Sequence, residues 1–204
     1  MPPHDDNCAP ERFDLHRIAP QPWKNGAGLT REIAAAAAGS DGFDWRISVA
    51  DVARDAPFSA FPGIDRCIVL LHGAGLRLRA DDGSLDHRLD TPCEPFHFAG
   101  DVAPHATLLG GPSGDFNVMV LRRSVFRWAV TCHRDATELA AAPVVLMFGC
   151  TGSRQMGQIG EPSTLSLAAD QALLRRAPAA AFTLQPLTAD ARLLAVRLCL
   201  DKTP

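Results

Sequence analysis

RCIVLLHGAGLRLRADDGS, residues 66–84, contains the pattern that decides the fold of this chain. It holds two short runs, residues 66–73 and 76–80, which are mostly apolar or alternate between apolar and polar residues. The second run is followed by the turn sequence DDGS. Short runs of this kind bounded by turn residues are typical of β-strands. The stretch therefore predicts two consecutive strands.

The same pattern recurs along the whole chain, which contains 16 glycines and 16 prolines. Turn sequences such as GGPSGD, CTGS and LTAD separate the runs. Many short strands at this spacing favour a barrel or a sandwich. We therefore predict an all-β fold with few short helices. The predicted strands are residues 45–52, 66–73, 76–80, 94–100, 116–123, 125–132, 144–150, 164–176, 180–186 and 192–200.

Two segments carry helix signals. DATELAAAP, residues 135–143, is the better candidate, because Asp135 is a suitable N-cap and Pro143 follows the end of the run. The alanine run at residues 34–38 has high helix propensity, but it follows a glycine-rich turn and ends at Gly39. We predict a helix of about two turns for the first segment. For the second we predict a strand end or an irregular edge.

Composition and charge limit the partners. The chain of 204 residues is 47% hydrophobic with a formal net charge of −3, and its basic residues form no runs, so we expect no nucleic-acid partner. The first residues lack the basic start and apolar run of an export signal. No segment has the roughly 20 apolar residues that span a bilayer, so we expect no membrane partner. The six cysteines lack CxxC spacing and are expected to be reduced, which indicates a cytoplasmic protein.

A boundary is expected near residues 121–124. Polar-rich segments come before it, and plainer apolar strands follow it. This change fits two similar β-barrel halves, with residues 1–123 carrying a ligand site and residues 124–204 mainly structural. The sequence shows no clear internal repeat, so the duplication is a hypothesis.

The segment PQPWKNGAGLTREI, residues 20–33, combines a glycine turn with polar residues that neither a turn nor a strand needs. Lys24 and Asn25 supply hydrogen-bond donors at the turn, where backbone N–H groups are also accessible. Arg31 is able to hold a carboxylate bidentately, and Glu32 to pair with a cation that would otherwise be buried alone. The alternative interpretation is an exposed turn followed by a surface ion pair.

Residues 45–66 contribute the next candidates. Arg46 and Ser48 share one face of the predicted strand, and Arg46 is the other arginine suited to a carboxylate. Alternatively, Arg46 is a solvated strand arginine. The following segment, PFSAFPG, places Phe58 and Phe61 around Ser59. It is either a movable loop at a ligand site or a hydrophobic plug at the end of a barrel.

Asn117 is a polar residue within the otherwise apolar strand FNVMV, residues 116–120. A buried amide of this kind needs hydrogen-bond partners. Asn117 therefore either satisfies a neighbouring backbone group or contacts a ligand.

Signatures of metal binding and of covalent catalysis are missing. The seven histidines include no HxH pair, which would direct two imidazoles from one strand to the same metal ion. There is no GxSxG motif, no plausible Cys–His arrangement, and no GxGxxG or Walker motif. We predict no metal, no other cofactor and no catalytic residue.

Five segments resemble the HutD/Ves family of cupin-like proteins. They are PWKNGAGLTREI (22–33), FDWRISVADV (43–52), PFSAFPGIDRCIVLLHGAGLRL (57–78), FAGD (98–101) and LLGGPSGDFNVMV (108–120). The resemblance is dense over residues 20–123 and loose beyond them. It departs from the family pattern at Ala27, where glycine is more usual. It implies a double-barrel cupin, a bicupin of RmlC-like jelly rolls, without the metal histidines of cupin enzymes.

The resemblance also implies a link to histidine utilisation, in which HutD is thought to act as a regulator. It suggests a small anionic metabolite as the partner, such as formylglutamate or formiminoglutamate, and no enzymatic activity is established for the family. The predicted ligand-binding residues are Lys24, Asn25, Thr30, Arg31, Arg46, Ser48, Phe58, Ser59, Phe61 and Asn117.

Two questions stay open in the sequence. The alternative function is a cupin enzyme acting on a small carboxylate, either metal-free or with the unconventional metal ligands His97, Asp101 and His105. The predicted function leans away from catalysis. The oligomeric state is also open, with a homodimer as one option.

Overall fold

The computed structural model describes residues 9–37, 42–124 and 126–200. The described residues divide into two compact units, one of residues 18–124 and one of residues 9–17 and 126–200. Within these ranges the one helical element is a 3-10 turn, η1 (Leu15–Arg17), and the remaining elements are strands. The all-β prediction is confirmed. None of the described residues forms a helix long and apolar enough to cross a membrane.

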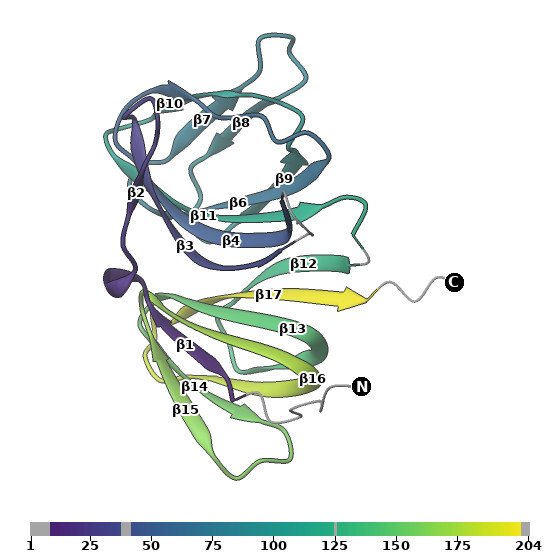
Figure 1. Ribbon diagram of the computed structural model, residues 1–204. Coiled ribbons are helices and arrows are strands. Elements are labelled where there is room, and N and C mark those ends of the chain that lie inside the picture. Colours follow the sequence, from purple (N-terminus) through teal and green to yellow (C-terminus); the bar gives the residue numbers. More distant parts are fainter. Residues whose placement is uncertain (1–8, 38–41, 125, 201–204) are drawn as a thin grey trace. The chain divides into compact units, whose positions relative to one another are not determined.

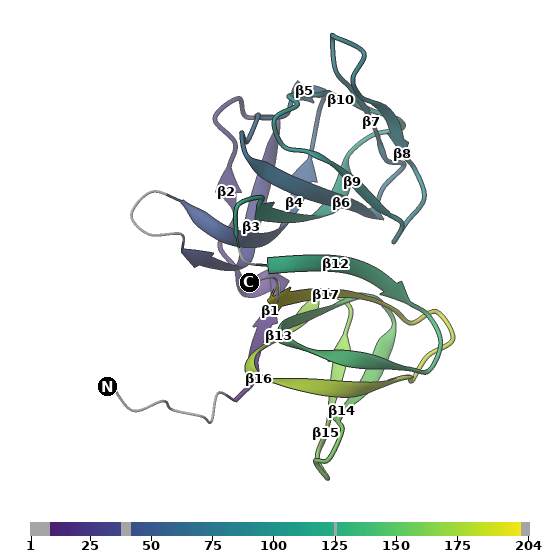
Figure 2. The same ribbon diagram turned by 90° about the vertical axis from the view of Figure 1, so that its right-hand side faces the viewer.

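The unit of residues 18–124 consists of two antiparallel sheets. The six-stranded sheet runs in the order β2 (Gln21–Pro22), β3 (Gly28–Ala37), β4 (Phe43–Val52), β11 (Ser113–Leu121), β6 (Ile64–His72) and β9 (Pro95–Ala99). The four-stranded sheet runs in the order β5 (Ala56–Pro57), β10 (His105–Leu108), β7 (Leu76–Arg79) and β8 (Asp86–Leu89). Figures 1 and 2 show the two sheets of this unit facing each other.

Alternation along the strands decides which side chains enter this unit. Ile68 and Leu70 of β6 and Leu76 and Leu78 of β7 belong to one buried cluster, so the two sheets share a core. Successive residues of a strand point to opposite faces of the sheet. The core cluster therefore fixes which face of β6, and of the strands paired with it, is directed inward.

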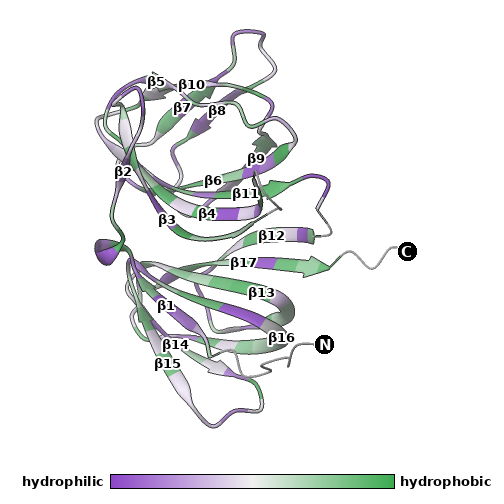
Figure 3. Ribbon diagram, viewed as in Figure 1, coloured by the Kyte–Doolittle hydropathy of each residue, from purple (hydrophilic) through white to green (hydrophobic). Residues whose placement is uncertain are grey.

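The unit of residues 9–17 and 126–200 is built from one seven-stranded sheet. Its main order is β12 (Phe126–His133), β17 (Arg192–Leu200), β13 (Thr137–Thr151), β16 (Gln171–Pro186), β14 (Ser153–Gln158) and β15 (Thr164–Ala168). In Figure 3 the strand β17 is coloured as hydrophobic over most of its length. The strand β1 (Glu11–Asp14) also belongs here, because it pairs with β16. The sequence instead predicts residues 1–123 as one half, with this segment included.

The helix predicted at residues 135–143 is wrong. The structure has the first part of β13 there, with Thr137 opposite Leu184 and Leu139 opposite Phe182 of β16. Register shifts follow Leu139 and Ala142, and such bulges bend a strand. Pairing with β16 and burial of Leu139 outweigh the helix propensity of the alanines, which tertiary contacts readily override.

The alanine run also extends a strand. β3 continues through it to Ala37, and residues 38–39 of the expected strand end lie outside the described residues. The first residue of the predicted strand 125–132 lies outside them as well.

Arg154 of β14 stabilises the second unit from inside. Its side chain is only 1% exposed. Its Nη2 donates to the carbonyl oxygens of His133 at 2.8 Å and Ala191 at 3.0 Å, and its Nη1 donates to that of Asp135 at 3.0 Å. These bonds connect β14 to the end of β12 and to the start of β17.

Replacement of this side chain should destabilise the protein. Arg154→Met removes three hydrogen bonds to carbonyl oxygens, one buried and two partly buried, and we expect the free energy of unfolding to fall by about 3 kcal/mol. Urea denaturation measures the change. Arg17→Met is the control, because the Arg17 side chain is 88% exposed and its loss should cost less than about 0.5 kcal/mol. Equal effects of the two substitutions would contradict the role assigned to Arg154.

Candidate functional site

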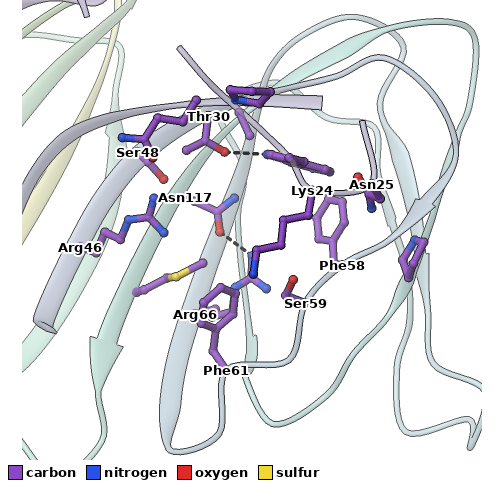
Figure 4. Close-up of a pocket in the computed structure, with 16 residues that line it drawn as sticks. Lys24, Asn25, Thr30, Arg46, Ser48, Phe58, Ser59, Phe61, Arg66 and Asn117 are labelled. Carbon is purple, nitrogen blue, oxygen red and sulfur yellow. Dashed lines mark hydrogen bonds between the residues drawn. The ribbon is translucent and has the colours of Figure 1, made fainter. Parts of the chain in front are cut away.

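A cavity of about 550 Å³ opens inside the unit of residues 18–124. Its wall comes from β3, β4, β6 and β11 together with the segments 21–25 and 57–61 (Figure 4). Nine of the ten predicted ligand-binding residues line it, namely Lys24, Asn25, Thr30, Arg46, Ser48, Phe58, Ser59, Phe61 and Asn117. The structure thus brings together residues far apart in sequence, while their binding of a ligand stays a prediction.

Arg31 lies outside this cavity. In the pairing of β3 with β4, Thr30 is opposite Ala50 and Arg31 is opposite Val49. Thr30 and Ala50 line the cavity, so the next residue of the strand, Arg31, points to the other face of the sheet. There it forms an ion pair with Asp51, with Nη1 and Oδ2 2.5 Å apart. Arg31 is therefore not one of the residues that line this cavity.

Arg46 is the arginine of β4 that faces the cavity. Its Nε donates to Oε2 of Glu32 at 2.6 Å. Glu32 thus pairs with the arginine that lines the cavity, and not with Arg31 as in the alternative interpretation. Because Nε of Arg46 is engaged by Glu32, its terminal nitrogens are the groups left for a ligand.

The segment before β3 folds back as a tight turn over the cavity. The backbone N–H of Gly26 donates to the carbonyl of Trp23 at 2.9 Å, and Gly26 has a φ of 66°, which glycine adopts without strain. Oδ1 of Asn25 accepts from the N–H of Ala27 at 3.0 Å. Nε1 of Trp23 donates to Oγ1 of Thr30 at 2.7 Å (Figure 4). The glycine therefore shapes the turn, and the turn holds Lys24 and Asn25 at the cavity.

The aromatic segment 57–63 forms another part of the wall. The N–H of Phe58 donates to the carbonyl of Pro104 at 2.8 Å, and the N–H of Phe61 donates to that of Gly100 at 2.6 Å. The ring of Phe58 meets the ring of Trp23 edge-on, with centroids 5.5 Å apart. The two phenylalanines thus supply apolar wall, and the movement expected for this segment stays a prediction.

Arg66 of β6 is a cavity residue that sequence reasoning missed. Its side chain is 3% exposed, and its guanidinium lies 4.9 Å from the ring centroid of Phe98 and 5.4 Å from that of Phe61. Its Nη2 donates to Oδ1 of Asn117 at 2.8 Å. Among the residues that the structure describes, its Nε and Nη1 have no hydrogen-bond partner. Burial lowers the pKa of Arg66 to about 10, against the opposing charge of Asp115.

A signal for Arg66 was present in the sequence. It lies two and four residues before Ile68 and Leu70, so strand alternation directs it to the same face as these core residues. An arginine on the core face of a strand is costly unless it is paired, and it therefore marks a candidate site.

Asn117 joins Arg66 to a second buried charge. While its Oδ1 accepts from Arg66, its Nδ2 donates to Oδ1 of Asp115 at 2.5 Å. Asp115 is fully buried, and its Oδ2 lacks a partner within the described ranges. Burial raises the pKa of Asp115 to about 7, against the charge of Arg66 and the hydrogen bond from Asn117. The amide thus pairs with side chains rather than with neighbouring backbone.

The metal-dependent alternative does not fit the residues present. A metal ion needs at least three suitable protein ligands around one point. In the described part of the chain, no three His, Cys, Asp or Glu side chains lie close enough to hold one. Asp101 instead accepts hydrogen bonds from Nη2 of Arg122 at 2.7 Å and from the N–H of Gly63 at 3.0 Å. His97, Asp101 and His105 therefore do not form a metal site.

The comparison with known sequences identifies the family. The sequence model of the HutD family matches residues 15–194. The chain belongs to the HutD family. It is 41% identical to Protein Ves of Citrobacter koseri over 148 residues, which cover 72% of this chain and 76% of Ves. It is 36% identical over 141 residues to a Pseudomonas putida protein named for its place in the hutC 3′ region, with coverage of 68% and 73%.

Solved structures agree with this assignment. HutD from Pseudomonas fluorescens superposes with a TM-score of 0.79 at 28% identity, covering 94% of this chain and 99% of that one. A cupin 2 conserved barrel protein from Leptotrichia buccalis shares 8% identity, and its TM-score of 0.57 over 92% of this HutD-family chain shows the fold alone. The chain is therefore a HutD-family protein with a cupin fold.

The buried carboxyl group makes a prediction for stability. The folded protein holds a proton on Asp115 up to about pH 7, whereas an unfolded chain releases it near pH 4. Between these values the free energy of unfolding should fall as pH rises, by up to about 1.4 kcal/mol per pH unit from this group. Urea denaturation across this range measures the slope. The Asp115→Asn variant should lack this contribution, and an identical slope in both proteins would refute the argument.

Proposed function

We propose that this protein is a non-enzymatic regulator of histidine utilisation that binds a small acidic intermediate in the cavity beside Arg66. Formylglutamate and formiminoglutamate are the candidate ligands. The observation that carries the proposal is the buried guanidinium of Arg66, which lines the cavity with two nitrogens that no described residue accepts from. A carboxylate oxygen is the acceptor that such donors bind best.

The other cavity groups support an acidic ligand. Lys24 and Arg46 add two cationic side chains to the wall, and Ser48 and Ser59 add hydroxyl groups. Small-molecule sites combine apolar walls with a few convergent polar groups of this kind. The rings of Phe58 and Phe61 provide the apolar part. A compact carboxylate with a short chain fits both the charge and the size of the cavity.

Relatives support the metabolic assignment. The family match covers most of the chain, and one relative is named for its position beside hutC in Pseudomonas putida. The family is associated with histidine utilisation, whose intermediates include small acids. This assignment is consistent with action in the cytoplasm.

Regulation requires that the ligand favours one conformation over another. The segment 58–63 is the candidate for this change, because it contributes Phe58 and Phe61 to the cavity wall and lies outside the strands. The N–H of Phe58 donates to Pro104, the N–H of Phe61 donates to Gly100, and the carbonyl of Gly63 accepts from the N–H of Arg122; together these bonds define one state of the segment. Ligand binding would stabilise one arrangement of these contacts.

Ligand screening tests the proposal directly. Thermal-shift assays with histidine, urocanate, formiminoglutamate, formylglutamate and glutamate should show stabilisation by at least one acidic compound. At about 100 times its dissociation constant a ligand adds about 2.7 kcal/mol to the free energy of unfolding. Chromatography after incubation should recover the compound unchanged. Absence of stabilisation by all five would refute ligand binding, whereas conversion of a compound would favour the enzymatic alternative.

Matched arginine variants test the site. Arg66→Met removes the buried, unpaired donors of a cavity-lining residue and should weaken binding of formylglutamate by about ten- to a hundredfold, since hydrogen bonds to charged groups are worth about 1.5–3 kcal/mol. Arg31→Met removes the arginine on the opposite face of the sheet and should change affinity less than about twofold. Calorimetric titration measures both. Equal losses for the two variants would place the binding site elsewhere.

A further inference from the structure

The buried chain of Arg66, Asn117 and Asp115 connects the cavity to a carboxyl group that does not line it. The three side chains come from two adjacent strands, since Arg66 of β6 lies opposite Met119 of β11, two residues beyond Asn117. Asn117 holds the cation with its oxygen and the carboxyl group with its nitrogen. Arg66 therefore lines the cavity and also interacts electrostatically with the buried carboxyl group of Asp115.

Buried hydrogen-bonding atoms stay unpaired at both ends of this chain of three side chains. At one end is Arg66, which lines the cavity and whose buried Nε and Nη1 have no acceptor among the described residues. At the other end, Oδ2 of Asp115 has no donor among them. A buried acceptor oxygen without a donor is costly, and protonation of the carboxyl group reduces that cost by removing its charge.

We propose that the cavity binds its anion together with a proton, and that Asp115 is the group that takes this proton up. The inference rests on the proposed function, because it requires an anion at Arg66. When the carboxylate of the ligand pairs with Arg66, the cation no longer compensates the charge of Asp115. A second anionic group in the same low-dielectric site then makes the ionised form of Asp115 less favourable. The proton comes from solvent, and no covalent bond of the ligand changes.

The surroundings of Asp115 leave Arg66 as its main charged partner. Asp51 of β4 adds a like charge, which favours the protonated form. Asp51 is itself engaged by Arg31, and by His72 of β6 with Nε2 and Oδ1 3.6 Å apart. From β7, β8 and β10, the residues in the buried cluster are apolar, namely Leu76, Leu78, Leu89 and Ala106. Arg46 acts on Arg66 from β4 while paired with Glu32.

The expected pH dependence follows by linkage. Asp115 of the ligand-free protein loses its proton near pH 7, and the bound anion raises this value further. Above about pH 7 the dissociation constant should therefore rise with pH, by up to about tenfold per pH unit. Below about pH 7 Asp115 is already protonated, and the affinity should level off.

Calorimetry of formylglutamate binding in buffers of different ionisation enthalpy counts the protons. At about pH 8 we expect uptake of up to about one proton per site. Asp115→Asn should bind without proton uptake and with an affinity independent of pH. His72→Gln is the control, because it removes an ionisable partner of Asp51 and leaves the hydrogen bonds of Arg66, Asn117 and Asp115 in place; it should keep the proton uptake. Binding without proton uptake by the unaltered protein overturns this inference and leaves the proposed function intact.

A second measurement needs no ligand. Carbon-13 NMR follows the carboxyl group of Asp115 against pH in the unaltered protein and in Arg66→Met, which removes the positive charge as a bound anion would neutralise it. We expect the titration of Asp115 to move up by about one pH unit or more in the variant. Titration below about pH 5 in both proteins, or at the same pH in both, overturns the inference. If no compound binds while the NMR shift appears, the proposed function fails and the coupling of Asp115 to Arg66 stands.

Discussion

The pairing of β11 with β4 on one side and β6 on the other is the constraint on which the candidate site depends. This register places Asn117 opposite Ser48 and Ile68, and Met119 opposite Arg46 and Arg66. Strand alternation then sends the side chains of these pairs to the same face of the sheet. A shift of β11 by one residue would direct Asn117 and Asp115 to the other face and separate them from Arg66.

Two buried arginines show how the same residue type serves different purposes. In the unit of residues 9–17 and 126–200, Arg154 donates from both terminal nitrogens to three backbone carbonyls, so the fold itself pairs these nitrogens. Arg66 donates to one side chain and faces three aromatic rings, those of Phe58, Phe61 and Phe98. Cation–π contacts stabilise a guanidinium without engaging its N–H groups in the ring plane. Arg66 is therefore held at the cavity wall while its buried Nε and Nη1 have no acceptor among the described residues.

Two acidic residues of the six-stranded sheet pair with arginines near the cavity. Glu32 engages Nε of Arg46, and Asp51 engages Arg31 on the opposite face. Arg31 is paired on the opposite face of the sheet and does not line the cavity. Arg46 lines the cavity, and its pair with Glu32 engages only its Nε. The cationic groups that line the cavity outside these pairs are Arg66, Lys24 and the terminal nitrogens of Arg46. The resulting cavity is cationic in a protein whose net charge is negative.

The sequence by itself determined the all-β class, because strand alternation and turn residues are local patterns. It failed at residues 137–143, where pairing with β16 outweighs the helix preference of alanine. Only the tertiary structure decided that Arg46 faces inward and Arg31 outward, and that Arg66 and Asp115 are linked through Asn117. These facts depend on the register between strands distant in sequence, and a single chain contains no local signal for which residues will lie opposite each other.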